Sequence, residues 1–178
     1  AAYAKRTALM KEKLEAGLKS RLPQTDDTKR CLANVTALLE APLNPEQLLE
    51  EGYRVEFTSS GRMTVAIRDR EGRDLYLHSN GNVSKEAFLL AKHWTEKPAD
   101  TYIIYGLGMG YHIEELLYLS PDSKIEIYET DMNMLKLSCA FSRIEALLQD
   151  VEVQLIYDPD GSLIRQRLKE RNKNEAVC

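Results

Sequence analysis

A short apolar run that leads into three alternating glycines constrains this chain more than any other feature. Residues 101–105 are β-branched or aromatic, the sequence GLGMG follows at 106–110, and apolar residues then recur at helical spacing. A strand, a glycine turn and a helix in this order are typical of the first unit of a Rossmann-like domain. In such a turn one glycine permits the tight bend and the next allows a ligand to approach the backbone, while the helix N-terminus attracts anionic or polar groups. The pattern predicts that Gly106, Gly108 and Gly110 bind a nucleotide-type ligand.

The same alternation of strand and helix continues to the last residue. Short β-rich runs occur at Thr101–Tyr105, Lys124–Tyr128 and Val151–Tyr157, with helical stretches between them and a further helix at Ser162–Arg171. Parallel β-α-β units explain this order most economically, so the predicted fold class is α/β with a Rossmann-like parallel sheet. Residues 175–178 resemble the start of another strand. Because Rossmann-type domains normally have more strands, we expect an incomplete sheet and a fragment of a larger protein.

The first half of the chain has a different periodicity. Apolar residues at four-residue spacing predict amphipathic helices around Leu14 and Val35, and Asn44-Pro45 predicts the start of a short helix. Residues 53–57 and 63–67 alternate between apolar and polar, which predicts an antiparallel hairpin, with a third strand at 75–77. A helix capped by Ser84 is expected to follow and to run to about Trp94. We therefore predict a small α+β domain with a hairpin or three-stranded sheet.

A polar segment with a proline, residues 96–100, separates these two patterns. It has no periodicity, and proline with polar residues is typical of a connection between domains. The predicted organisation is an amino-terminal α+β domain at residues 1–97 and the start of a Rossmann-like nucleotide-binding domain at residues 98–178.

Composition excludes several classes of function. The net charge is −4 and the basic residues are spread among acids, which argues against a nucleic-acid partner. No apolar run reaches the roughly 20 residues that cross a bilayer, so no membrane span is expected. Three cysteines without Cys-x-x-Cys spacing indicate neither a disulfide framework nor a metal site, and both Cys31 and Cys139 are expected to be small core residues. A cytoplasmic location fits this composition best.

Two acidic residues follow the second predicted strand. Glu129 and Asp131 lie about 20 residues beyond the glycine turn, the separation at which a carboxylate meets ribose hydroxyls in such folds. A carboxylate can accept two hydrogen bonds from a cis-diol, so Glu129 is the first candidate and Asp131 the second. The alternative is that both residues merely cap the helix that begins near Met132.

Other candidate ligand contacts lie at the start of the first helix and after the third strand. Tyr111 takes the sixth place of G-x-G-x-x-G, where dinucleotide sites have a small residue, which favours a mononucleotide, nucleotide-sugar or S-adenosylmethionine over NAD or FAD. His112 is predicted either as a hydrogen-bond donor or cation toward a ligand or as a residue without a role. Asp158 lies where ligands bind in open α/β folds, although an Asp-Pro-Asp-Gly sequence is also a common turn. His78 and His93 have no metal-ligand spacing and are expected to be structural or exposed.

The sequence IYGLGMGYH at 104–112, with EEL at 114–116 and IYE at 127–129, resembles the motility accessory factor family and its relatives, the archaeal 6-hydroxymethylpterin diphosphokinase-like proteins. This resemblance implies a Rossmann-like domain after an amino-terminal domain, in a bacterial transferase related to flagellin glycosylation. It implies a nucleotide-activated sugar such as a CMP-sugar as donor and a protein such as flagellin as acceptor. It implies no catalytic residue, because this chain ends before much of the family domain.

The same residues are also similar to S-adenosylmethionine-dependent methyltransferases, including the spermidine-synthase-like branch. That resemblance implies that the glycine turn contacts the methionine moiety and that Glu129 holds the ribose. Many methyltransferases carry an acidic residue two positions before Tyr105, and the Ile103-Ile104 pair offers none. The remaining alternative is a non-catalytic scaffold in which the glycine turn is a structural relic.

Overall fold

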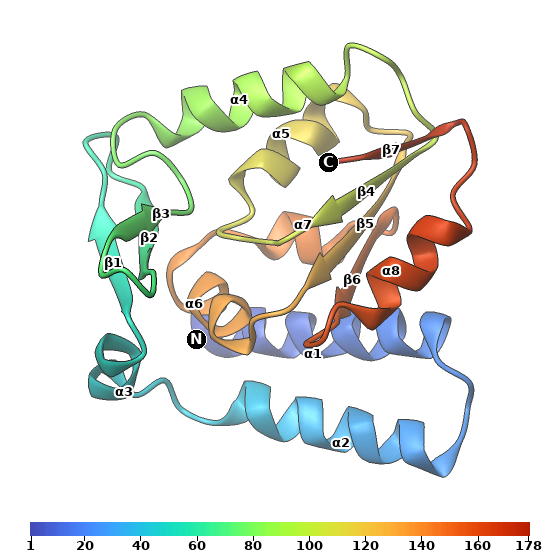
Figure 1. The fold of residues 1–178 in the computed structure, drawn as a ribbon, viewed down its shortest axis with the longest axis horizontal. Helices are drawn as coiled ribbons and strands as arrows, with labels where there is room; N and C mark the ends of the chain where they lie inside the picture. The colour runs from blue at the N-terminus through green and yellow to red at the C-terminus, as the bar shows by residue number, and fades with distance from the viewer.

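The computed structural model describes residues 1–178 and contains two separate sheets (Figure 1). The larger sheet has four parallel strands in the order β6-β5-β4-β7. Its strands are β4 (Thr101–Tyr105), β5 (Lys124–Glu129), β6 (Val153–Tyr157) and β7 (Glu175–Val177). The α/β class, the parallel sheet and the incipient strand at the end of the chain are confirmed. The third predicted strand begins two residues later than expected, since Val151 is 88% exposed.

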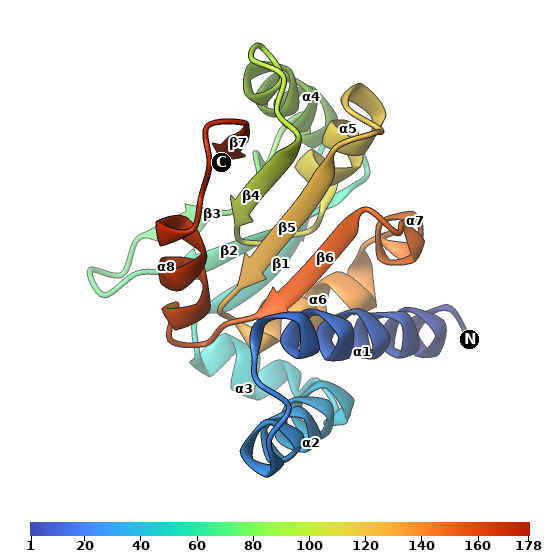
Figure 2. The ribbon, with the colours of Figure 1, turned by 90° about the vertical axis from the view of Figure 1, so that its right-hand side faces the viewer.

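Helices connect successive strands of this sheet and cover both of its faces. They are α5 (Tyr111–Leu119), α6 (Met132–Phe141), α7 (Glu145–Gln149) and α8 (Ser162–Lys169). Figure 2 shows α8 on one side of the strands and α6 and α7 on the other. The strand order reverses at β4, which lies between β5 and β7. In open α/β sheets this reversal creates a crevice at the carboxyl edge, and the glycine turn follows β4 at that edge.

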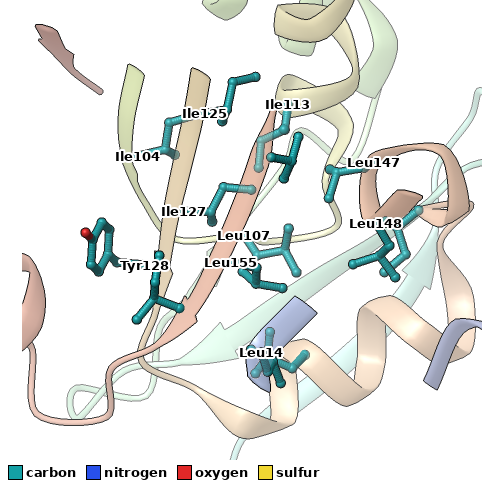
Figure 3. Close-up of a cluster of buried hydrophobic side chains, with 14 of the residues drawn as sticks. Leu14, Ile104, Leu107, Ile113, Ile125, Ile127, Tyr128, Leu147, Leu148 and Leu155 are labelled. Carbon is teal, nitrogen blue, oxygen red and sulfur yellow. The ribbon is translucent and has the colours of Figure 1, made fainter. Parts of the chain in front are cut away.

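The main core lies on the face of the sheet that α5 and α7 cover. Ile104, Ile127 and Leu155 of three neighbouring strands are fully buried and point to the same side, toward Ile113 of α5 (Figure 3). Their common direction follows from the two-residue period of a strand and from the parallel register, which pairs Ile104 with Ile127 and Ile127 with Leu155.

The opposite face carries a buried ion network beneath α8. Arg167 of α8 donates from Nε to Glu126 of β5 at 2.8 Å and from Nη2 to Glu175 of β7 at 2.5 Å. Arg21 also donates to Glu126, at 2.9 Å. The network joins β5, the edge strand β7 and the end of the first helix, and none of these pairs is visible from sequence spacing.

The smaller sheet is antiparallel and has three strands. They are β1 (Tyr53–Phe57), β2 (Met63–Arg68) and β3 (Asp74–Tyr76), in the order β1-β2-β3. The short helix α3 (Pro45–Glu50) precedes it, capped by the Asn44 side chain. The predicted hairpin and third strand are confirmed.

Two long helices at the start of the chain pack close to the parallel sheet. They are α1 (Ala2–Arg21) and α2 (Asp26–Glu40). Met10, Leu14 and Leu18 of α1 are buried in the main core, and α1 crosses β6 at the edge of the sheet (Figure 2). Residues of the predicted amino-terminal domain thus share a core with the parallel sheet. The predicted domain boundary between residues 97 and 98 stays a prediction.

The prediction for Cys31 is wrong, and the prediction for Cys139 is confirmed. Cys139 is buried, whereas Cys31 is exposed. Residues Thr28, Val35 and Leu39 form the buried stripe of α2, and Cys31 lies off that stripe. Both are free thiols.

Helix α4 (Val83–Trp94) joins the two sheets and packs along α5. It ends as expected, but Asn82 rather than Ser84 is its N-cap, with the Asn82 side chain accepting from the Lys85 N–H at 3.0 Å. Asparagine caps as well as serine does, and Val83 then lies fully buried within the first turn. None of the helices combines the length and the apolar composition that a membrane span requires.

Candidate functional site

The glycine turn is built by alternating glycines with buried apolar residues. Gly106, Gly108 and Gly110 have φ angles of +94°, +53° and +81°, a region that other residues rarely adopt. The intervening side chains are fully buried in two different clusters: Leu107 in the main core, and Met109 in a second cluster with residues of β2, α4, α5 and α6. The turn is therefore held from both sides.

The space beside each glycine differs. A Cβ added at Gly108 would lie 2.8 Å from Nε2 of His78, and one at Gly110 would lie 3.0 Å from Cγ2 of Ile144. Nothing lies within 4 Å of the corresponding position at Gly106. The glycine beside which a ligand can approach is thus Gly106, while Gly108 and Gly110 are required by their own dihedral angles and by protein neighbours.

Glu129 ties the end of β5 to the turn. Its Oε2 accepts a hydrogen bond from the Leu107 N–H at 2.8 Å, and its Oε1 accepts from the Asp131 N–H at 2.8 Å. The side chain is 5% exposed, and burial raises the pKa of this carboxyl while the two N–H donors lower it. Glu129 does not cap α6. The geometry instead gives it a shaping role for the turn, beside which ribose recognition stays a prediction.

His78, in the loop after β3, holds the middle of the turn. Its Nε2 accepts from the Met109 N–H at 2.9 Å, which requires a neutral ring with the proton on Nδ1. Its ring lies 5.7 Å from that of His112, which in turn lies 5.6 Å from Trp94. Burial lowers the pKa of both histidines to about 4, and the neighbouring His78 contributes to the shift at His112. Both rings are neutral at pH 7, so His112 cannot serve a ligand as a cation, and a hydrogen bond from His112 to a ligand stays a prediction.

Tyr111 is directed away from solvent. It is 5% exposed, belongs to the second cluster, and donates from its hydroxyl to the Met63 carbonyl of β2 at 2.7 Å. The Arg62 guanidinium lies over its ring, 5.0 Å from the centroid. The bulky residue in the sixth place is accommodated because the small sheet covers the start of α5.

The two candidate aspartates each cap a helix. Asp131 accepts from the Asn133 N–H of α6 at 2.9 Å and from the Tyr53 hydroxyl at 2.5 Å. Asp158 is 1% exposed and accepts from the Leu163 and Ile164 N–H groups of α8 at 3.1 and 2.9 Å. Contact of either carboxylate with a ligand stays a prediction. No group of three or more His, Cys, Asp or Glu side chains is placed to hold a metal ion.

Free donors remain at the start of α5. The N–H groups of Gly108, Tyr111 and His112 donate to no acceptor in the protein, whereas those of Gly106 and Leu107 are satisfied by β5. Unpaired N–H groups at a helix N-terminus favour an anionic or polar group.

A cavity of about 470 Å³ lies at the carboxyl edge of the parallel sheet. We call it the edge cavity. Its lining includes Tyr105, Thr130, Pro159, Asp160, Gly161, Ile164, Arg165, Leu168 and Val177. Tyr105 and Thr130 are the neighbours of Gly106 and Glu129 in the chain, so the cavity lies close to the turn, although neither the turn residues nor Glu129 line it. The volume is within the range of small-molecule sites.

Several residues that shape the turn carry no signal in the sequence. His78 lies 31 residues before Met109, and Ser142 donates to the Met109 carbonyl from 33 residues after it. Such contacts depend on how the small sheet and the α6–α7 connection pack on the turn. A local motif search finds the glycines and Glu129, but it cannot find partners that only the tertiary fold brings close.

The two buried histidines predict a loss of stability in acid. The folded-state pKa of about 4 lies below the ordinary value of 6.5, so the unfolded chain binds more protons and stability falls as the pH drops from 6.5 toward 4. Between pH 7 and pH 5 the loss for each histidine is about 2 kcal/mol. Urea unfolding of the wild type and of His78→Gln at both pH values measures it.

The variant comparison removes the contribution of His78, together with the part of the His112 shift that His78 causes. Burial raises the pKa of Glu129 and Glu114, so their contributions change in the opposite direction, but they are present in both proteins. We expect His78→Gln to lose roughly 2 kcal/mol less than the wild type between pH 7 and pH 5. An equal loss in the two proteins would contradict the buried, neutral state of His78.

Comparison with known proteins gives a likeness of fold at low identity. No family model matches the chain, and no curated protein does either. Among solved structures the chain is similar to MNMC2 from Aquifex aeolicus, with 20% identity, a TM-score of 0.42 and coverage of 97% of this chain and 62% of that one. It is also similar to the MAf glycosyltransferase from Magnetospirillum magneticum AMB-1, with 15% identity, a TM-score of 0.47 and coverage of 96% and 32%. The chain spans less than two thirds of either protein.

Proposed function

We propose that this chain forms the nucleotide-binding part of a transferase that uses a nucleotide-activated donor. The observation that carries the proposal is the open side of Gly106, at the point where the strand order reverses and beside the edge cavity. This is the position at which open α/β sheets bind their ligands. The motif at residues 104–112, which resembles the motility accessory factor family, supports a donor such as a CMP-sugar and an acceptor such as flagellin.

In this proposal each part of the site has a separate task. The ligand backbone passes Gly106, and the unpaired N–H groups at the start of α5 receive a phosphate or another polar group. The ribose lies near Glu129 and Asp131, whose oxygens can accept further hydrogen bonds through lone pairs that their present donors leave free. The edge cavity receives the base or the transferred group.

A second candidate is methyl transfer from S-adenosylmethionine. It is favoured by the charge of the edge cavity, whose lining has one arginine, Arg165, and one aspartate, Asp160. Arg165 donates to the Asp160 carbonyl at 3.0 Å, so the cavity offers no concentration of positive charge for a di- or triphosphate. Adenosine with a zwitterionic methionine group needs none.

Thermal unfolding with a panel of ligands tests these proposals. The panel contains CMP, CTP, GTP, a CMP-sugar, S-adenosylmethionine and S-adenosylhomocysteine, each with and without magnesium. A ligand that binds only the folded chain raises the midpoint, by an amount that grows with its concentration. Stabilisation by cytidine nucleotides supports the activated-donor proposal, and stabilisation by S-adenosylhomocysteine replaces it with methyl transfer. No shift with any member contradicts both and favours the scaffold, in which Glu129, Asp131 and Asp158 act only through their internal hydrogen bonds.

A further inference from the structure

A second hollow lies between the small sheet and the helices that follow the glycine turn, and it has a volume of about 520 Å³. We call it the hairpin cavity. Its lining comes from the β1–β2 hairpin, from α5 and from the α6–α7 connection: Phe57, Gly61, Arg62, Met63, Tyr111, Glu114, Phe141, Ser142 and Arg143. It shares no lining residue with the edge cavity. An occupant of one cavity therefore leaves the walls of the other intact.

The charged groups of the hairpin cavity are two arginines and one glutamate. Arg62 pairs with Glu114 only at 3.7 Å, a long separation for an ion pair. Arg143 is exposed and makes no salt bridge or hydrogen bond within the chain. Burial raises the pKa of Glu114, although Arg62 opposes the shift. The cavity thus presents an excess of positive charge with one guanidinium free, and guanidinium groups bind carboxylates and phosphates in a bidentate manner.

Two aromatic side chains of the lining are left open to solvent. Phe57, at the end of β1, is 78% exposed, and Phe141, at the end of the well-buried helix α6, is 47% exposed. Their rings, from the hairpin and from the end of α6, offer an apolar surface next to the arginines. A ligand with only a charge would leave this surface uncovered.

We propose that the hairpin cavity binds a small anion that carries a ring, with a carboxylate or phosphate group held by Arg62 and Arg143 and the ring against Phe57 and Phe141. The site does not depend on the nucleotide proposed at Gly106. It is linked to the turn, because Ser142 lines the cavity and donates to the Met109 carbonyl at 2.5 Å. A second substrate bound here would lie next to the turn.

Titrations followed by amide chemical shifts test the proposal, with benzoate, phenyl phosphate, inorganic phosphate and benzyl alcohol as probes. At least one aromatic anion should bind saturably and shift the amides of residues that line the hairpin cavity. Benzoate and phenyl phosphate distinguish a carboxylate site from a phosphate site. Arg143→Gln should weaken binding roughly tenfold, as expected for loss of a charge-assisted contact. Glu114→Gln should tighten binding, since it removes a like charge and frees Arg62.

Two variants serve as controls. Arg68→Gln removes an exposed arginine of β2 outside the cavity and should leave binding unchanged. Gly106→Ala should also leave it unchanged, which separates this site from the nucleotide site. The proposal is overturned if neither aromatic anion binds, if benzyl alcohol or inorganic phosphate binds as tightly as the aromatic anion that binds best, or if the binding of that anion is insensitive to Arg143→Gln or lost in Gly106→Ala.

Discussion

Replacing Gly17 with alanine is expected to destabilise the fold by about 3 kcal/mol, an effect opposite in sign to the usual one in a helix. Gly17 is buried where α1 crosses β6, and an added Cβ would lie 2.1 Å from the Leu155 carbonyl oxygen and 2.9 Å from its carbon. The obstacle is strand backbone, which cannot move aside as a side chain can. Helix propensity alone predicts that this replacement stabilises the protein by about 1 kcal/mol.

Urea unfolding of Gly17→Ala and of Ala16→Gly separates the cost of the clash with the β6 backbone from the difference in helix propensity. Ala16 is exposed on the same helix, so Ala16→Gly should cost only the propensity difference of about 1 kcal/mol. A Gly17→Ala protein as stable as the wild type or more stable would show that α1 does not pack on the backbone of β6.

The second large effect is expected from Glu129→Ala. The variant leaves the buried Leu107 N–H and the half-buried Asp131 N–H without their acceptor, and a buried unpaired donor costs about 1–3 kcal/mol. We expect a loss of about 3 kcal/mol in the free energy of unfolding. Glu129→Gln keeps one acceptor oxygen and should lose less.

Hydrogen exchange locates this effect at the turn. The Leu107 amide should exchange faster in Glu129→Ala than in the wild type, beyond the change that global destabilisation explains. Glu50→Ala, at an exposed glutamate without hydrogen-bond partners, should change stability by no more than about 0.5 kcal/mol. Unchanged protection of Leu107 in Glu129→Ala would contradict the shaping role of Glu129.

The elements of this fold were largely predictable because their local signals agree with the tertiary structure. The alternation of β1 and β2, the Asn44-Pro45 start of α3 and the strand–glycine–helix order at β4 each depend on neighbours within a few residues. Errors arose where two local signals competed. At the start of α4, both Asn82 and Ser84 are good caps, and burial of Val83 within the first turn accompanies the choice of Asn82.

The candidate site was predictable only in part. Spacing identifies Gly106 and Glu129. It does not reveal that His78 occupies the space beside Gly108 or that the Glu129 carboxylate accepts a hydrogen bond from the Leu107 N–H. The bulky Tyr111 was interpreted as a sign of ligand type, whereas its hydroxyl reaches across to the small sheet. Such roles depend on contacts between segments far apart in sequence.

The most direct test of the account compares Gly106→Ala with Gly72→Ala in the presence of the most stabilising ligand of the panel. The two glycines have similar φ angles, +94° and +78°, and nothing lies within 4 Å of an added Cβ at either. Both variants should therefore lose about 1–2 kcal/mol of unfolding free energy from backbone strain. Only Gly106 faces the proposed ligand. We predict that the ligand still raises the unfolding midpoint of Gly72→Ala and no longer raises that of Gly106→Ala. An equal rise in the two variants would contradict binding at the glycine turn.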